Sequence, residues 1–416
     1  MEKMNHTGNR KTLSRRKFVS QTVAGSTLAL LSPMVFFGEN CQDKSAAWPR
    51  DSSKYRVHMI GNAHIDPVWL WPWPEGIAVV YSTFRSALDR MKETPDVTFT
   101  ASSAQFYQWI AENDPDMLKE IRKYVDEGRW NIAGGWWIEP DVNIPCGEAM
   151  VRQGLYGQMT FQRLLGHRAK VAFNPDSFGH TGTLPQIIKG QGMEDYIFMR
   201  PGIREKSLPG DLFWWEGVDG TRVLTYRIPI SYGDDGSVRK RIEDTIEQIK
   251  GQPMKSFMAF YGAGDHGGGA TKENIRSIEE LKTEKGAPKV FFSTIDNYFK
   301  EIRETEGLML PAVKDDLQHH AVGCYTAESD VKKGNRQSEA ALITAEKLAS
   351  IGTAAWGSGY PKEELTNAWK KVLFLQFHDS LAGTSLAEHY QHAPEGFGYA
   401  MDVAHQTSYL SLQKLE

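Results

Sequence analysis

The amino-acid sequence predicts an α/β fold with mainly parallel strands, followed by a small helical bundle. Between residue 55 and about residue 300, short runs rich in β-branched and aromatic residues alternate with segments of helical periodicity, which is typical of βαβ units. After about residue 315 the helical periodicity continues without strand signals. The 416 residues are enough for a large core. We therefore expect an α/β domain over residues 55–312 and a helical domain over residues 313–416.

The first 45 residues are predicted to be a targeting segment that lies outside the fold. Residues 14–19 are Ser-Arg-Arg-Lys-Phe-Val, a twin-arginine pattern, and a weakly apolar stretch follows over residues 23–37. Pro33 and the shortness of this stretch argue against a membrane-spanning helix. We expect export by the twin-arginine route to the periplasm or cell envelope. Cys41 would suit a lipid-anchored start, but Gly38-Glu39-Asn40 before it is a poor lipidation signal.

Short runs of strand-forming residues are bounded by turn-forming residues along the α/β part. They cover residues 55–61, 97–101, 130–133, 170–173, 196–199, 223–227, 257–261 and 290–293. One further run, 212–215, is expected to pair with 223–226 as a hairpin with Asp219-Gly220 as its turn. In folds of this class, functional side chains sit at the carboxyl ends of the strands.

Helical periodicity occupies the segments between the strands and most of the C-terminal part. The predicted helices cover residues 83–92, 115–127 and 147–165 in the α/β part, and 338–351 and 363–377 in the helical part. Gly128 ends the second of these, and a Gly/Ser/Pro-rich stretch over 357–361 separates the last two.

Charge and composition exclude some partners and favour others. The formal net charge of −4 gives no electrostatic reason to expect nucleic acid or an anionic membrane as a partner. The sequence leaves the oligomeric state open.

Cys146 and Cys324 form neither a disulfide framework nor a zinc knuckle, and they could be paired or free. Twelve Trp are many, and the clusters at 69, 71 and 73, at 136 and 137, and at 214 and 215 would suit sugar rings, although core packing is the commoner role of a single Trp.

The most informative motif is Gly-Asn-Ala-His64-Ile-Asp66-Pro-Val-Trp69, which follows the strand predicted over residues 55–61. Side chains two residues apart on a strand point to the same face, so His64 and Asp66 are expected to project together. An imidazole and a carboxylate presented this way suit a borderline metal such as zinc. A polar strand end without a ligand is the alternative for this motif taken alone.

Three further motifs place chemically active residues at the ends of elements. Asp176 lies in Asn-Pro-Asp-Ser-Phe-Gly-His, after the strand over 170–173, and Asp265 lies in the glycine-rich Tyr261–Gly269 segment after the strand over 257–261. His378 and Asp379 follow the helix over 363–377. Taken singly, Asp176 could cap a helix, the Asp265 segment could be an ordinary loop, and His378 could be a satisfied helix-end imidazole.

Together the four motifs resemble the α-mannosidases of glycoside hydrolase family 38. The resemblance runs from about residue 55 to about residue 392, and it includes Leu184-Pro185-Gln186, residues 196–200 and the segment from Lys332 to Glu339. It implies a seven-stranded-type irregular (β/α) barrel of mainly parallel strands followed by a three-helix bundle. Most members of the family continue into large β-rich domains, and we expect these to be absent here because the sequence stops at Glu416.

The resemblance also implies a cofactor and roles for individual residues. His64, Asp66, Asp176 and His378 would hold one Zn²⁺. Asp176 would also be the nucleophile and Asp265 the general acid/base. The substrate contacts would be Trp69, Phe178, Arg200 and Asp379.

These roles agree with the chemistry of a retaining glycosidase acting on mannose-containing glycans. Such an enzyme needs two carboxyl groups about 5 Å apart, one ionised to attack and one protonated to donate. Zinc at one oxygen of Asp176 would keep that residue ionised, whereas Asp265 would keep its proton for the leaving oxygen. Two other classes remain possible at this point. A metal-dependent carbohydrate deacetylase would use a metal-bound water, and a glycan-binding protein would bind sugar without turnover.

Overall fold

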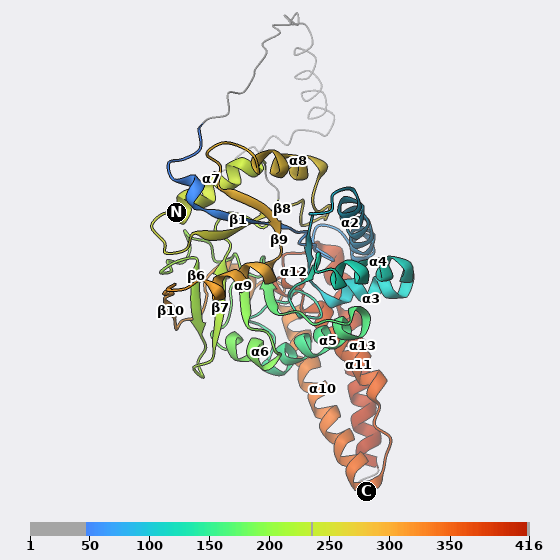
Figure 1. Ribbon diagram of the computed structural model, residues 1–416. Coiled ribbons are helices and arrows are strands. Elements are labelled where there is room, and N and C mark those ends of the chain that lie inside the picture. Colours follow the sequence, from blue (N-terminus) through green and yellow to red (C-terminus); the bar gives the residue numbers. More distant parts are fainter. Residues whose placement is uncertain (1–46, 234–235, 414–416) are drawn as a thin grey trace, which may run out of the picture. The chain divides into compact units, whose positions relative to one another are not determined.

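The computed structural model describes residues 47–233 and 236–413, and most of its strands pair in parallel (Figure 1). The fold is therefore of the mixed α/β class that the alternating pattern predicts. The twin-arginine motif, the apolar stretch over 23–37 and Cys41 lie outside the described residues. Among the helices of the described part, none is long and apolar enough to cross a membrane.

The first sheet has three parallel strands in the order β8-β1-β9. Its central strand, β1 (Arg56–Gly61), is buried at every position after Arg56. A parallel strand covered on both faces must be apolar at nearly every position, and Val-His-Met-Ile fits this apart from His58. The neighbours are β8 (Ser256–Tyr261) and β9 (Lys289–Ser293).

The second sheet has five strands in the order β10-β6-β7-β5-β4, all parallel to their neighbours except the β6–β7 pair. Their bounds are β4 Val171–Asn174, β5 Asp195–Phe198, β6 Leu212–Glu216, β7 Arg222–Arg227 and β10 Ala312–Val313. The predicted hairpin is thus confirmed, but its turn is shifted by one residue. The Gly220 amide bonds the Gly217 carbonyl at 3.0 Å, and Gly220 follows the turn with a φ of 84°.

The remaining strands, β2 (Phe99–Ala101) and β3 (Trp130–Ile132), form a parallel pair. An isolated bridge between Asn62 and Thr100 links this pair to the end of β1. Within the described residues, the ladders of backbone hydrogen bonds therefore form three groups. The closed barrel stays a prediction. Phe173 on β4 and Phe260 on β8 stack at 6.1 Å between ring centroids, so the first two sheets pack on each other.

Helices follow most of the strands and cover them on the outside (Figure 1). In the α/β part they are α2 Trp73–Glu93, α3 Ala104–Asn113, α4 Pro115–Asp126, α5 Gly147–Leu165, α6 Leu184–Gly190, α7 Val238–Gln248, α8 Lys272–Leu281 and α9 Ile295–Glu304. The prediction over 147–165 matches α5, whereas α2 begins ten residues before the predicted 83–92. Single-turn 3-10 helices cover Ser52–Lys54 and Val322–Tyr325.

Three long helices and one short helix make up the C-terminal part. They are α10 Ser329–Trp356, α11 Lys362–Leu375, α12 His378–Ala382 and α13 Ala387–Gln413. α10 and α13 run side by side, and α11 packs against both and against α5 (Figure 1). The short helix α12 sits where this helical part meets the α/β part, and it begins at His378.

The clustered Trp residues mostly serve the core. Trp136, Trp137 and Trp215 are at most 2% exposed, so they cannot be sugar platforms. Trp69 is partly exposed and Trp73 is about half exposed. Cys146 and Cys324 are free thiols.

Candidate active site

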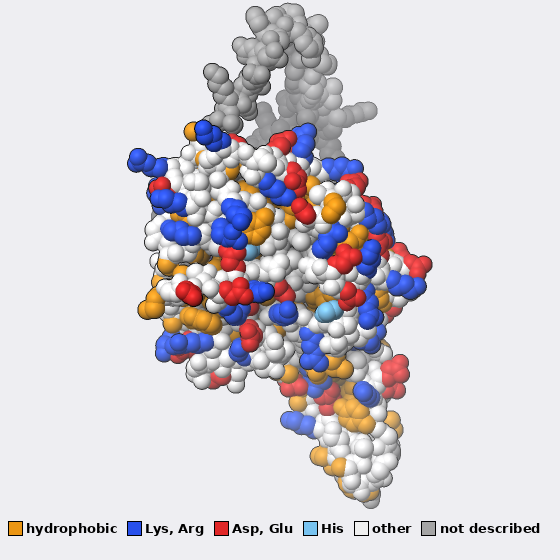
Figure 2. All heavy atoms as spheres, in the orientation of Figure 1, with side chains coloured by type: hydrophobic (Ala, Val, Ile, Leu, Met, Phe, Trp, Pro, Cys, Tyr) orange, Lys and Arg blue, Asp and Glu red, His pale blue; other side chains and the backbone are white. Residues whose placement is uncertain are grey.

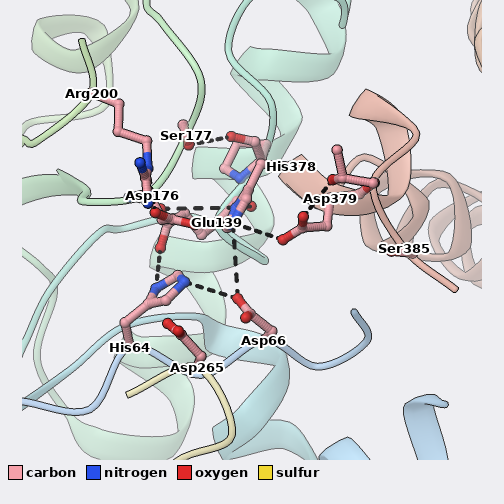
Figure 3. Close-up of polar contacts among 12 residues, drawn as sticks. His64, Asp66, Glu139, Asp176, Ser177, Arg200, Asp265, His378, Asp379 and Ser385 are labelled. Atoms are coloured by element: carbon pink, nitrogen blue, oxygen red, sulfur yellow. Dashed lines mark hydrogen bonds and ion pairs between the residues drawn. The ribbon is translucent and has the colours of Figure 1, made fainter. Parts of the chain in front are cut away.

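The four sequence motifs converge at one place (Figure 3). His64 and Asp66 follow β1, Asp176 follows β4, Asp265 follows β8, and His378 begins α12. β1 and β8 are neighbouring parallel strands of the first sheet, and β4 belongs to the second sheet. The loops after the carboxyl ends of all three carry these side chains, as in other folds of this class. The helical part contributes the fourth element, so both parts of the chain are needed to complete the group.

Backbone contacts hold the loops after β1 and β8 against each other. The Asp66 amide donates to the Asp265 carbonyl at 2.9 Å, and Ile65 forms a bridge with Asp265. Gly262 makes this close approach possible, because a Cβ there would lie 2.3 Å from the Asn62 carbonyl oxygen. Asp265 itself has a φ of 56°, a left-handed conformation that is uncommon for a residue other than glycine.

His64, Asp66, Asp176 and His378 bring nitrogen and oxygen atoms together in a buried space. His64 Nε2 lies 2.9 Å from Asp66 Oδ1, and His378 Nε2 lies 3.4 Å from Asp176 Oδ2. His378 Nε2 is also 3.9 Å from Asp66 Oδ1.

These atoms fit a metal ion better than they fit each other. His64 Nε2, Asp66 Oδ1 and His378 Nε2 are buried and have no hydrogen-bond partner in the part of the chain that the structure describes. Unpaired buried polar atoms are costly, and two imidazoles with carboxylates form a donor set that zinc accepts. The same region offers two overlapping ligand groups, one of His64, Asp66 and His378, the other of Asp176, His378 and Asp379.

Electrostatics in this space favours the charged forms of Asp176 and of the two imidazoles, but not that of Asp66. Burial alone would raise the pKa of Asp176, but the neighbouring His378, together with His64 and Arg200, holds that pKa well below its usual range. Burial would lower the pKa of each imidazole, yet Glu139 and Asp66 raise the pKa of His64, and Asp176 and Asp379 raise that of His378. Burial raises the pKa of Asp66 to about 7 against the opposing influence of His64.

Arg200 binds the second oxygen of Asp176. Its Nε donates to Asp176 Oδ1 at 2.6 Å, so the two carboxylate oxygens have different partners. Buried His180 holds the Arg200 backbone, because its Nε2 donates to the Arg200 carbonyl at 2.7 Å while Nδ1 accepts from the Tyr196 hydroxyl at 2.7 Å. The histidine that ends the Asn-Pro-Asp-Ser-Phe-Gly-His motif thereby connects the loop of Asp176 to Arg200.

The other predicted substrate contacts surround the same group. Asp379 Oδ2 lies 3.3 Å from His378 Nε2, and the ring of Phe178 meets the His378 ring edge-on at 5.6 Å between centroids. Trp69 is linked to this group through its neighbour Trp71. Its ring contacts Trp71, whose indole nitrogen donates to the Asp66 carbonyl at 3.0 Å.

Two residues at the site were not among the predicted ones. Tyr232 donates its hydroxyl to Asp265 Oδ1 at 3.0 Å, and its ring meets His64 at 4.9 Å between centroids. Glu139 lies after β3, with Oε2 3.0 Å from His64 Nδ1. The sequence contains one indication of Glu139, because it is an acidic residue shortly after a predicted strand. Its neighbours Trp136 and Trp137, however, are typical of a hydrophobic core. No comparable signal marks Tyr232, which lies in a loop.

Comparison with known proteins agrees with this arrangement. The model of the glycosyl hydrolases family 38 N-terminal domain matches residues 54–323, and that of the alpha mannosidase middle domain matches residues 319–415. Alpha-mannosidase G of Dictyostelium discoideum is 34% identical over 341 residues, which are 82% of this chain and 31% of that protein. Human alpha-mannosidase 2C1 is 33% identical over 338 residues, which are 80% of this chain and 32% of that protein.

The chain thus spans about a third of the length of these curated relatives. Among solved structures, an alpha-mannosidase from Enterococcus faecalis V583 has the same fold, with a TM-score of 0.78 at 22% identity over 87% of this chain and 42% of that one. The first family model covers well over half of the sequence and contains all the strands. The chain therefore belongs to glycoside hydrolase family 38.

Proposed function

We propose that this chain is a zinc-dependent retaining α-mannosidase that removes α-linked mannose from glycans through a covalent mannosyl-Asp176 intermediate. The proposal rests on two carboxyl groups with different partners beside the buried His64, Asp66 and His378. Asp176 is bound by Arg200, and Asp265 is bound by the Tyr232 hydroxyl. The curated relatives with about a third of their residues identical are named as α-mannosidases, which supports the substrate class.

The proposed cofactor would be held by His64, Asp66, Asp176 and His378. When bound, zinc would supply a Lewis-acidic charge beside the sugar hydroxyls. Asp176 Oδ2 faces the His378 side of this group, whereas Oδ1 is held by Arg200 Nε at 2.6 Å. Oδ1 is thus the oxygen that we assign to attack on the anomeric carbon, and Arg200 orients it and stabilises its negative charge.

Asp265 is assigned the proton transfers. It is partly exposed, and the Tyr232 hydroxyl fixes its Oδ1. In the first step Asp265 would give its proton to the leaving glycosidic oxygen while Asp176 forms the ester bond. In the second step it would take a proton from the water that cleaves the ester, so that Asp176 is released and the product retains its anomeric configuration.

The surface on the face drawn in Figure 2 agrees with an uncharged substrate. Lys and Arg side chains alternate there with Asp and Glu, and neither sign gathers into a large patch. Such a face has no strong field that would concentrate a polyanion.

The first experiment is hydrolysis of a nitrophenyl α-mannoside by the purified chain, before and after removal of metal with a chelator. We expect turnover that the chelator abolishes and added zinc restores. A fluorinated mannosyl fluoride should then leave a sugar on the peptide containing Asp176, detected by mass spectrometry. Sugar binding without turnover would instead identify a glycan-binding protein, and turnover without a label on Asp176 would reject the covalent step.

We also propose export by the twin-arginine route, on the basis of Arg15 and Arg16 followed by the apolar stretch. Residues 1–45 fused to a cytoplasmically folding reporter should direct it out of the cytoplasm. Replacing both arginines by lysine should abolish this transfer, and unchanged transfer would contradict the route.

A further inference from the structure

Glu139 contacts three of the four proposed metal ligands (Figure 3). Its Oε2 lies 3.0 Å from His64 Nδ1, and its Oε1 accepts the Asp176 amide at 3.0 Å. Its backbone carbonyl accepts from His378 Nδ1 at 3.2 Å and from the His378 amide at 3.3 Å. The side chain is 2% exposed, so water does not compete for these contacts.

These contacts decide which histidine nitrogens face the metal. A neutral imidazole that donates through Nδ1 keeps its lone pair on Nε2. The Glu139 carbonyl accepts a hydrogen bond from His378 Nδ1. The Glu139 carboxylate lies within ion-pair distance of His64 Nδ1, although these two atoms are not aligned as a hydrogen bond. The two Nε2 atoms, which point toward Asp66 and Asp176, are thereby left free to bind a cation.

The segment that carries Glu139 is fixed from both sides. The Ile138 amide donates to Gln153 Oε1 on α5 at 3.2 Å, and the Asp141 amide donates to the Gln376 carbonyl just before α12 at 2.9 Å. Gly157 on α5 lets this segment approach closely, since a Cβ there would lie 2.2 Å from the Gly135 carbonyl oxygen. Glu139 is therefore held by elements of both the α/β part and the helical part.

We propose that Glu139 is a positioning residue for the metal site, which sets the tautomer of His64 and fixes the backbone of Asp176 so that the ligand set is formed before the metal arrives. The inference rests on the metal site of the proposed function. It predicts that Glu139 acts on metal affinity, because partners of this kind orient the ligands and raise their basicity.

The test is zinc affinity of metal-stripped protein, measured by competition with a chromophoric chelator. Glu139→Gln keeps the shape but replaces one acceptor oxygen with an NH₂ group, so His64 Nδ1 or the Asp176 amide loses its acceptor. We expect zinc to bind about 10- to 100-fold more weakly. The matched control is Asp141→Asn, which removes the carboxylate of another buried side chain in the same segment. Among the described residues, the Asp141 carboxylate accepts from the amides of Asn143 and Ile144, neither of which is a proposed metal ligand, and we expect less than a 3-fold change.

A second measurement detects the proton on His64 directly. In the zinc-loaded wild-type protein with ¹⁵N-labelled histidine, long-range NMR should show His64 protonated at Nδ1, and in Glu139→Gln this signal should change. If Glu139→Gln fails to fold, Glu139→Asp is measured instead, since its shorter side chain cannot reach His64 Nδ1 and the same loss is expected.

The possible results distinguish the metal site of the proposed function from the positioning role of Glu139. Wild-type protein that binds no zinc would reject the metal of the proposed function and this role with it. Tight zinc binding by wild type together with an unchanged affinity and NMR signal in the Glu139 variant would overturn only the positioning role. Equal losses in the Glu139 and Asp141 variants would also overturn it, because they would show a general effect of buried charge.

Discussion

At the scale of single residues, Asp176 and Asp265 have opposite surroundings. Asp176 is buried between two imidazoles and Arg200, all of which favour its ionised form against the cost of burial. Asp265 is partly exposed, and the Tyr232 hydroxyl is its side-chain partner among the described residues. Pairs of carboxyl groups in such different environments divide the roles of nucleophile and acid in glycosidases.

Asp265→Asn tests this division of roles. The variant cannot protonate the leaving oxygen, so hydrolysis of a mannoside with a poor leaving group should fall by about 100-fold or more. A fluorophenyl mannoside, which needs little protonation, should be spared in the first step. The check is burst kinetics on both substrates. Equal slowing of both, or no change in either, would mean that another residue is the acid.

His64→Ala and His378→Ala test the metal ligands. Each variant removes one imidazole from the buried group, so zinc content and mannosidase turnover should be lost together. Elemental analysis of purified wild type should find about one zinc per chain. His58→Ala is a useful control, because it removes a buried histidine of β1, the strand before His64, whose side-chain contacts are Ser293 and Glu301 and not the proposed ligands. Full zinc occupancy in the first two variants would refute the assignment.

The residues at the site differ in how far sequence alone could predict them. His64 and Asp66 are two positions apart at the end of an evident strand, so their convergence follows from strand geometry. The approach of His378 depends on how the helical part packs, and only the family resemblance predicted it. Glu139 acts through its backbone carbonyl as well as its side chain, and no residue type encodes a carbonyl contact.

At the scale of elements, a buried polar network joins α5, α10 and α11 just before His378. Gln376 Nε2 donates to Asn335 Oδ1 at 2.8 Å and to Glu339 Oε1 at 3.1 Å, while its Oε1 accepts from Gln153 at 3.3 Å. Glu339 also accepts the Cys146 amide at the start of α5 at 2.9 Å. Because Gln376 and its three side-chain partners are buried, this network specifies how the helical part docks.

Gln376→Ala should therefore lower both stability and metal binding. It leaves Asn335 Oδ1 without its partner and opens a cavity, which together cost roughly 3 kcal/mol. Urea unfolding of metal-free protein measures this cost. Asn367→Ala, at an exposed position of α11, should change stability by less than about 0.5 kcal/mol. A Gln376 variant as stable as the Asn367 variant would show that the network does not hold the helices together.

The strands were predicted well because each is a short apolar run between turn-forming residues, and all the proposed runs form strands. Helix lengths were predicted less well. α10 extends from Ser329 to Trp356, beyond the predicted 338–351, because tertiary packing along α13 stabilises turns whose own periodicity is weak. The turn of the β6–β7 hairpin shifted by one residue because Gly220 takes the left-handed position after it instead of a central one.

At the scale of the whole molecule, β1 joins two separate buried charge systems. Beyond its carboxyl end lie His64 and Asp66, and nearer its start His58 is enclosed between β9 and α9. His58 Nδ1 lies 2.8 Å from Ser293 Oγ, and its Nε2 lies 3.2 Å from Glu301 Oε2. Burial lowers the pKa of His58 to about 4, although Glu301 opposes this. The hydrogen bond from Arg56 lowers the pKa of Glu301 to about 2.

These two pKa shifts make the folded state less stable in acid, each over its own pH range. Between about pH 6.5 and pH 4 the unfolded chain binds a proton at His58 that the folded chain does not, so stability falls as the pH falls. The stabilisation from Glu301 is complete above its unfolded pKa of 4.5 and is lost as the pH falls from there toward 2. His58 is therefore the group of this pair that acts at mildly acidic pH.

We predict that His58 contributes roughly 1.5 kcal/mol to the loss of stability between pH 6.5 and pH 5, because the slope rises from half of 1.36 kcal/mol per pH unit at the unfolded pKa of 6.5 toward the full value below it. His58→Asn should be less stable than wild type at pH 6.5 but should lose less on acidification, because the residue that gains the proton on unfolding is gone. Urea unfolding with a chelator present, at pH 6.5 and pH 5, measures both slopes. His167→Asn, at an exposed histidine paired with Asp126, should keep the wild-type slope. A His58→Asn variant that kept it too would place the acid sensitivity of this fold elsewhere, for example in His180, whose pKa burial lowers to about 3.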